Sequence, residues 1–327
     1  MSGQLVAVTG AHGFIGAAYC RHALARGQPL RRLVRTLPAA GATDGSNGPA
    51  RHGGDTDVVA IDLARAHVDQ LARAFDGAFA VLHFAGRAHV MQETAPDADA
   101  AYSSANVDVT ERVALAAVAA GVRKFVFAST VKVNGEATLP GRPFRPGDAP
   151  APHDAYARSK LAAERTLAQV ASGTSMLATN LRLPLVYGPG ARGNFRRLVD
   201  AVAARRVLPL GAIDNRRSVL ALPNLMDALD AIVAAQATVI GTHFVADATS
   251  ISTPALVRAI AAALGVAPRL VPVPVFALRM AGALSGRGEA IARLTDSLEV
   301  DTASLARATG WRPRPVAIDA ASVHASA

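Results

Sequence analysis

Three glycines near the start of the chain constrain its fold more than any other feature. Gly10, Gly13 and Gly16 follow the apolar run 5–9 and open a helical pattern, in the sequence TGAHGFIG. This spacing lets the backbone turn tightly after a strand, brings amide N–H groups to a phosphate at the helix N-terminus and lets the helix pack close to the strand. The stretch predicts a strand, a turn and a helix that bind a pyrophosphate; the alternative is a glycine-rich turn without a ligand.

The first half of the chain alternates short apolar runs with Ala-rich helical patterns, which is typical of a parallel sheet with helices on both faces. We expect strands at 5–9, 30–35, 57–62, 80–86, 124–130 and 178–188, and helices that begin near Gly13, Val68, Ser104, Ala155 and Gly193. The pattern predicts an α/β fold, namely a doubly wound Rossmann sheet with a smaller C-terminal α/β substrate lobe.

Domain boundaries follow from the change of pattern after Gly188. We assign residues 1–188 to the dinucleotide-binding domain, with segments near 217–248 returning to it. Residues 189–216 and 249–327 then form the substrate lobe.

Composition excludes several classes of protein. Lys and Arg number 34 against 25 Asp and Glu, a formal charge of +9, but they form no long block, so an anionic small ligand is favoured over nucleic acid. The single cysteine, Cys20, excludes an internal disulfide, and no metal-ligand cluster is visible. Met1 leads straight into the first strand, and two prolines and an arginine interrupt the apolar segment 270–286. We therefore expect a cytoplasmic protein without a membrane span, and a buried or interfacial helix in 270–286.

The residue that reads the adenosine ribose should lie about 20 residues beyond the glycines, at the end of the second strand. Arg35 and Thr36 stand there, and no Asp or Glu does. A carboxylate accepts hydrogen bonds from the 2′-hydroxyl of NAD, whereas an arginine pairs with the 2′-phosphate of NADP. Arg35 thus favours NADP; with NAD it would stack on the adenine or face solvent. Asp62, at the end of the third strand, is either an acceptor for the adenine amino group or a turn residue.

Tyr156 and Lys160 stand four residues apart at the start of an expected helix, so they share one face of it. A phenol with a pKa of about 10 transfers protons at neutral pH only when a nearby group stabilises its phenolate, and a lysine ammonium does so. The spacing alone also fits a solvated helix. Together with the glycine loop and the Ser129-Thr130 pair at a strand end, however, it supplies the parts that hydride transfer needs.

These motifs together resemble the extended short-chain dehydrogenase/reductase family, which includes nucleotide-sugar epimerases, dehydratases and reductases. The resemblance covers nearly the whole chain. Its motifs occur in the family's order: 9-TGAHGFIG-16, 62-DL-63, 83-HFAG-86, 106-NV-107, 127-FASTVKVNG-135, 156-YARSK-160, 182-RLPLVYGPG-190 and 216-RRSVLALPNLMDAL-229.

The resemblance implies a role for each matching residue. Tyr156 becomes the acid/base, Lys160 its partner and ribose ligand, and Thr130 the catalytic Ser/Thr. The implied cofactor-binding residues, besides these and the Arg35-Thr36 pair, are Gly10, His12, Gly13, Phe14, Ile15, Gly16, Asp62, Leu63, Ala85, Gly86, Asn106, Leu183 and Pro184. Positions that hold the diphosphate and base of a nucleotide sugar fall on Asn194, Leu210 and Arg217, of which Arg217 has the guanidinium fork that suits phosphate.

The chain departs from the family's pattern in its substrate loops. Asn134 stands where a tyrosine is usual, Lys132 brings an unusual charge, and Leu185 replaces a common asparagine. With 83-HFAGRAHVM-91, these features look most like a bacterial subgroup that makes surface-polysaccharide sugars. Within that resemblance Arg87, His89 and Lys132 become substrate-binding candidates; the alternative is a loop histidine without a ligand and a solvated loop lysine.

The leading hypothesis is an NADPH-dependent reductase that acts on the C4 keto group of a UDP-linked 6-deoxy-N-acetylhexose. The alternative with identical catalytic parts is an NAD-dependent UDP-hexose 4-epimerase. A 4,6-dehydratase is disfavoured because 129-STVKV-133 lacks the acidic pair of such enzymes. From another class, a cofactor-sensing protein without catalysis is a further alternative. The resemblance also implies a homodimer formed through helices near 104–119 and 155–170.

Overall fold

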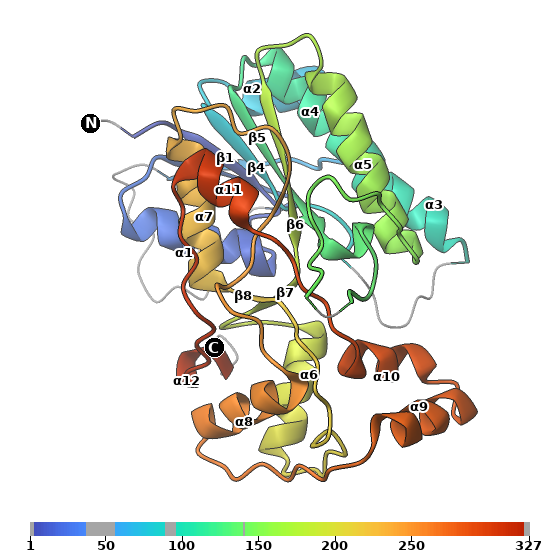
Figure 1. The fold of residues 1–327 in the computed structure, drawn as a ribbon. Coiled ribbons are helices and arrows are strands. Elements are labelled where there is room, and N and C mark those ends of the chain that lie inside the picture. The colour runs from blue at the N-terminus through green and yellow to red at the C-terminus, as the bar shows by residue number, and fades with distance from the viewer. Residues whose placement is uncertain (1–2, 37–55, 89–95, 140, 324–327) are drawn as a thin grey trace.

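The computed structural model describes residues 3–36, 56–88, 96–139 and 141–323, and its centre is a parallel sheet of seven strands (Figure 1). The strands lie in the order β3 (Thr56–Ala60), β2 (Leu30–Val34), β1 (Val6–Thr9), β4 (Ala80–His83), β5 (Lys124–Thr130), β6 (Leu177–Leu183) and β9 (Gly241–Phe244). The order reverses between β1 and β4, and in doubly wound sheets ligands bind at the carboxyl ends of the strands at such a point. The predicted α/β Rossmann architecture is confirmed.

Alternate residues along the strands are buried against opposite layers of helices. Val6 and Val8 lie in a cluster with α1 (Phe14–Ala25) and α7 (Leu222–Ala234). Ala7, between them, lies in a second cluster with α2 (Val68–Ala74), α4 (Val109–Ala119) and α5 (Ala155–Ala171). Because both faces of these strands are covered, they need the nearly continuous apolar runs that the sequence shows.

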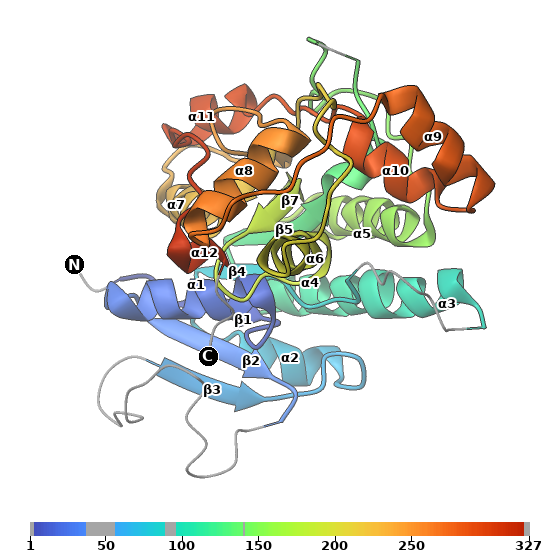
Figure 2. The ribbon, with the colours of Figure 1, turned by 90° about the horizontal axis from the view of Figure 1, so that it is seen from below.

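A smaller lobe follows the carboxyl ends of the strands. It contains the two-stranded parallel sheet of β7 (Leu185–Tyr187) and β8 (Val219–Ala221) and a separate apolar core that includes Phe195 and Ile260. Its helices are α6 (Gly193–Ala203), α8 (Thr253–Ala263), α9 (Val275–Leu284), α10 (Gly288–Thr295) and α12 (Ala320–Val323), and the view from below shows α6, α8, α9 and α10 gathered there (Figure 2). The remaining helix, α11 (Ala303–Thr309), contacts β9.

Parts of 217–248 contact the main sheet. β9 lies beside β6, and α7 packs against α1, whereas β8 pairs with β7 in the lobe. The domain boundaries stay a prediction.

Two predicted elements differ from the structure. The strand expected over 178–188 is divided at Pro184 into β6 and β7, because proline has no N–H to donate to a sheet. The helix expected from Ser104 begins at Ala98, where the Asp97 side chain accepts a hydrogen bond from the amide of Ala100 at 2.9 Å. It runs through α3 (Ala98–Tyr102) and a π-helical turn, η1 (Ser103–Asp108), before α4.

The apolar segment 270–286 contains the expected helix, α9, which is buried on one side only, and its place at an interface stays a prediction. Leu278 is buried, but Phe276, Met280 and Leu284 are 69%, 61% and 87% exposed. Within the described ranges, no helix has the length and apolar character needed to cross a membrane.

Candidate active site

The loop between β1 and α1 requires glycine for steric reasons. Gly10 has a φ of +68°, and a Cβ there would lie 2.6 Å from the backbone nitrogen of Ala85 at the end of β4. A Cβ on Gly16 would lie 2.2 Å from the carbonyl oxygen of Gly10. Gly13 caps α1, and the first turn of that helix contains no acidic residue. The loop and helix N-terminus therefore present backbone N–H groups at short range, as binding of a pyrophosphate requires.

A cavity of about 480 Å³ lies beside this loop at the carboxyl ends of the first strands. Of the residues predicted to hold a cofactor, it is lined by Gly10, His12, Gly13, Arg35, Asp62, Leu63, Ala85 and Gly86. Sequence reasoning missed its mostly apolar remainder, Ala11, Leu33, Val34, Ile61, Ala64, Phe84, Ala105 and Val109. These residues belong to strand ends and helix turns whose apolar character equally fits a core, so no motif marked them.

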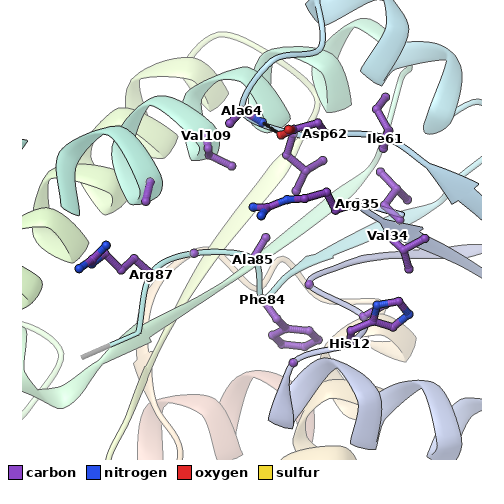
Figure 3. Close-up of a pocket in the computed structure, with 17 residues that line it drawn as sticks. His12, Val34, Arg35, Ile61, Asp62, Ala64, Phe84, Ala85, Arg87 and Val109 are labelled. Atoms are coloured by element: carbon purple, nitrogen blue, oxygen red, sulfur yellow. Dashed lines mark hydrogen bonds between the residues drawn. The ribbon is translucent and has the colours of Figure 1, made fainter. Parts of the chain in front are cut away.

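Basic side chains approach the cavity from different elements. Arg35 extends from the end of β2 into the space between Ala85 and the helix that carries Val109, and Arg87 comes from the loop after β4 (Figure 3). Asp62 is held by its own turn, because its Oδ1 accepts from the amide of Ala64 at 3.0 Å. Together with the steric cradle, these charges fit a dinucleotide, whose phosphates are anionic.

Thr130 and Tyr156 lie together beside this region. Thr130 is the last residue of β5, and Tyr156 is in the first turn of α5. Burial raises the pKa of the Tyr156 hydroxyl well above its ordinary value, and the Asp154 carboxylate acts in the same direction; a hydrogen bond with the Thr130 side chain lowers it. The two hydroxyls are thus close enough to share one reacting oxygen, and proton transfer by Tyr156 needs additional positive charge nearby.

Lys160 lies between α5 and the wall of the cavity. Its Nζ donates to the backbone oxygen of Ala128 at 2.9 Å and lies 4.5 Å from the centre of the Phe127 ring. It also lies 3.6 Å from the point that a Cβ on Gly86 would occupy. Burial lowers the pKa of Lys160 to about 8, against the opposing effect of the Glu164 carboxylate. The ammonium is therefore poorly hydrated and available to an adjacent oxygen.

Asn106 holds the loop after β4 against α5. Its Oδ1 accepts from the amide of Arg87 at 2.8 Å, and its Nδ2 donates to the backbone oxygen of Arg87 and to Ser159 Oγ at 3.2 and 2.9 Å. A Cβ on Gly86 would lie 2.6 Å from Asn106 Oδ1, so this contact also requires glycine. Asn106 thus positions residues of the cavity wall although it does not line the cavity itself.

A buried ion pair joins β6 to α5, the helix that carries Tyr156. Arg182 of β6 donates to both carboxylate oxygens of Glu164 of α5, at 3.0 and 2.6 Å, and both side chains are 5% exposed. Ser129 Oγ also donates to Glu164, and Arg182 Nη1 donates to Asn134 Oδ1 at 2.7 Å. The asparagine that departs from the family's pattern therefore ends a network that joins β5, β6, α5 and the loop after β5.

The other predicted cofactor residues surround these groups. Leu183 is the strand partner of Thr130 across β5 and β6, and Pro184 follows it, both buried. Phe14 and Ile15 form the first turn of α1, and Thr36 is exposed next to Arg35.

The predicted substrate residues are not brought together as clearly. Arg217 is half-buried in the lobe and donates from Nη1 to the backbone oxygen of Asp296 at 2.8 Å; burial lowers its pKa. Asn194 is exposed in the first turn of α6, whereas Leu210 is buried in the core of the lobe. Lys132 pairs with Asp154 and Glu136, and Arg87 lines the cofactor cavity. His89 lies outside the described residues.

Replacing Gly16 by alanine is expected to weaken dinucleotide binding. The new Cβ would collide with the Gly10 carbonyl, and overpacking of this kind costs roughly 1–3 kcal/mol, or about 5- to 150-fold in affinity. Titration of NAD or NADP by calorimetry measures the loss. The matched control is Gly147→Ala, since a Cβ at Gly147 meets no atom within 4 Å; equal affinities in the two variants would contradict the steric account.

Two relatives of known name match the chain over most of its length. A UDP-glucose 4-epimerase of Vibrio cholerae is 36% identical over 234 residues, which cover 71% of each protein. A 2-alkyl-3-oxoalkanoate reductase of Stenotrophomonas maltophilia is 27% identical over 276 residues, 81% of this chain and 77% of the relative.

Solved structures share the fold at low sequence identity. A UDP-glucuronic acid 4-epimerase from Bacillus cereus, in complex with NAD, superposes with a TM-score of 0.75 at 17% identity, over 98% of this chain and 96% of its own. MoeE5, in complex with UDP-glucose and NAD, gives 0.72 at 23% identity, over 95% and 94% of the two chains.

A family model described as the NAD dependent epimerase/dehydratase family matches residues 6–246. The match spans β1 to the residues just after β9, and so includes the glycine loop, Thr130, Tyr156 and Lys160. It confirms the resemblance that the motifs indicated: the chain belongs to the NAD dependent epimerase/dehydratase family of enzymes.

Proposed function

We propose that the protein oxidises or reduces C4 of the hexose in a UDP-sugar, and that its overall reaction is 4-epimerisation. The observation that carries the proposal is that the Thr130 side chain interacts with the Tyr156 hydroxyl, one helical turn from Lys160, whose Nζ lies 3.6 Å from the position of a Cβ on Gly86 in the cavity wall. An alcohol or ketone oxygen needs such a pair, one group to orient it and one to exchange its proton.

In this mechanism Thr130 donates a hydrogen bond to the C4 oxygen, and Tyr156 takes the proton of the C4 hydroxyl while the C4 hydrogen leaves as hydride. A pKa of about 8 keeps Lys160 mostly charged at neutral pH. Its ammonium lowers the pKa of Tyr156 when it turns from the backbone oxygen of Ala128 to the phenol. The 4-keto sugar then rotates within the site and is reduced on the opposite face of C4. Tyr156 returns the proton to the resulting alkoxide, whose configuration at C4 is inverted.

The bound dinucleotide supplies the hydride acceptor and donor. Its pyrophosphate would lie on the loop of Gly10, Gly13 and Gly16, and its adenosine beside Arg35, Thr36, Asp62 and Leu63, with His12 at the loop. Lys160 would hold the ribose side, and Asn106 would keep the Gly86–Arg87 segment of the wall in place. Leu183 and Pro184 would flank the nicotinamide side, with Phe14, Ile15, Ala85 and Gly86 completing the walls.

A 4-epimerase and a 4-reductase use the same catalytic residues, so these residues do not distinguish the two reactions and other observations are needed. The V. cholerae relative at 36% identity is named a UDP-glucose 4-epimerase, which favours epimerisation with retained NAD. Arg35 favours the second candidate, an NADPH-dependent 4-reductase, because it lines the cofactor cavity at the end of β2 where a carboxylate would read NAD.

The substrate part of the proposal assigns the diphosphate to Arg217, because a guanidinium fork suits phosphate, with Asn194 and Leu210 toward the base. Homodimerisation through α4 and α5 is proposed as well; Leu115, on the outer side of α4, is 41% exposed and would be covered by a second copy.

Identification of the nucleotide released by denaturing the purified protein tests the assignment. We expect stoichiometric NAD by mass spectrometry, because a 4-epimerase recycles its cofactor without releasing it. Bound NADP, or a protein that binds NADPH more tightly than NADH, would replace the epimerase with the reductase and give Arg35 its phosphate partner.

A further inference from the structure

Lys132 lies where the loop that carries Thr130 meets the helix that carries Tyr156. It belongs to the 3-10 turn η2 (Val131–Val133), and its amide donates to Thr130 Oγ1 at 3.3 Å. Its Nζ donates to Asp154 Oδ2 at 2.7 Å and to Glu136 Oε1 at 2.9 Å. The lysine side chain is only 17% exposed, so these contacts are partly shielded from water.

Asp154 connects this lysine with the acid/base. Its Oδ1 accepts from the amide of Ala157 at 2.7 Å and so caps α5, while its Oδ2 accepts from Lys132. Tyr156 follows two residues later in the first turn. The negative charge of Asp154 is second only to burial among the causes that raise the pKa of Tyr156. A cation on Asp154 therefore counteracts the carboxylate that opposes ionisation of the phenol.

We propose that Lys132 is a positioning residue of the acid/base centre. Its ion pair with Asp154 holds the turn η2, which follows Thr130, against the start of α5 and neutralises the carboxylate beside Tyr156. The proposal rests on the proposed function in one respect, namely that Tyr156 exchanges the proton. It gives Lys132 a role through Asp154 instead of a contact with substrate.

Other charged groups near this centre come from several elements. Asp154 caps α5, and Lys160 lies within it. The ring of Tyr102 in α3 lies 5.8 Å from the Tyr156 ring. The Arg87 guanidinium lies 5.2 Å from the Tyr102 ring. Glu136, the second partner of Lys132, also contacts Arg293 of α10 at 3.6 Å and raises the pKa of Arg217. Loss of Lys132 thus leaves Glu136 beside two arginines, and its main electrostatic effect falls on Asp154.

Two substitutions with opposite signs test the proposal. Lys132→Met leaves the Asp154 charge uncompensated, whereas Asp154→Asn removes that charge and keeps an oxygen that caps α5. The readout is the tyrosinate midpoint of Tyr156, from ultraviolet titration of protein saturated with NAD or NADP. Subtracting the same titration of a Tyr156→Phe protein isolates this residue among the four tyrosines of the chain.

We expect Lys132→Met to raise the midpoint by about one pH unit and Asp154→Asn to lower it by a similar amount, the size of one charge interaction in a partly buried site. The double variant should return near the wild-type midpoint, and Lys132→Arg should keep it. Arg158→Met is the matched control, because Arg158 of the same helix pairs with the exposed Asp99 at 2.8 Å; it should cause no shift.

Kinetics give the second readout. Hydride removal from C4 requires unprotonated Tyr156, so kcat/KM rises with pH through its midpoint. Lys132→Met should move this rise to higher pH. At pH values below the midpoint, kcat/KM should be about tenfold lower than in the wild type, with an unchanged KM for the UDP-sugar.

The proposal is wrong if neither single substitution moves the midpoint, or if both move it in the same direction, whichever substrate the enzyme uses. It is also wrong if Lys132→Met raises KM while the midpoint stays in place, since that result would put Lys132 on the substrate. Failure of the wild-type protein to turn over any UDP-sugar would overturn the proposed function instead, and the midpoints would still decide the role of Lys132.

Discussion

Tyr156→Phe is expected to reduce turnover by about 10²- to 10⁴-fold, the usual contribution of a positioned general acid/base. The substitution removes only the hydroxyl that, in the proposed mechanism, exchanges the proton with the C4 oxygen. The ring, its contact with Tyr102 and the cap of α5 all remain. Affinity for the dinucleotide should therefore change little, and steady-state kinetics with calorimetric titration measure the two quantities separately.

Tyr102→Phe is the control for this experiment. Its ring packs on Tyr156, and its hydroxyl donates to the backbone oxygen of Ala88 at 3.4 Å, away from Thr130. It should keep most of the wild-type rate. Full activity in Tyr156→Phe would exclude the mechanism, because another group would then have to exchange the proton.

Arg182→Met is expected to lower the free energy of unfolding by about 3–5 kcal/mol, because it leaves the Glu164 carboxylate buried without its cation. Such a loss is a large fraction of the 5–15 kcal/mol that is typical for a folded domain. Urea denaturation measures it. The double variant Arg182→Met/Glu164→Leu should recover much of the stability, since neither position then leaves an unpaired buried charge.

An exposed ion pair gives the comparison. Arg196 and Asp200 of α6 lie 2.8 Å apart with side chains 43% and 54% exposed, and Arg196→Met should cost less than about 1 kcal/mol. If Arg182→Met costs no more than this control, Glu164 is not a buried anion. The packing of α5 against β6 would then not depend on the pair.

The sequence predicts those parts of the site whose signal is local. Gly10 and Gly16 are recognisable because a turn after a strand admits no Cβ at these positions. Tyr156 and Lys160 are recognisable because one helical turn brings them to the same face. The Rossmann sheet follows from the alternation of apolar runs and helical patterns, and the largest differences from expectation are the break at Pro184 and the early start of a helix at Ala98.

Contacts between distant segments could not be predicted in this way. Arg182, Glu164 and Asn134 come from three separate elements, and nothing in their spacing shows that they meet. The resemblance makes Lys132 a substrate-binding candidate, and that role stays a prediction; the contact of its ammonium with Asp154, 22 residues further along the chain, has no signal in the sequence. The direction of the Lys132 side chain depends on how the loop after β5 packs against α5, which is a property of the tertiary structure alone.

The most direct test of the account is nuclear magnetic resonance of the sugar C4 during reaction. UDP-glucose or UDP-N-acetylglucosamine carrying deuterium at C4 is incubated with the protein without added dinucleotide. The account predicts inversion at C4 with the deuterium retained, because one bound cofactor takes the hydride and returns it to the same carbon. A sugar unchanged at C4, together with no reduction of a UDP-4-keto sugar by NADPH, would contradict the claim that this site performs redox chemistry at C4.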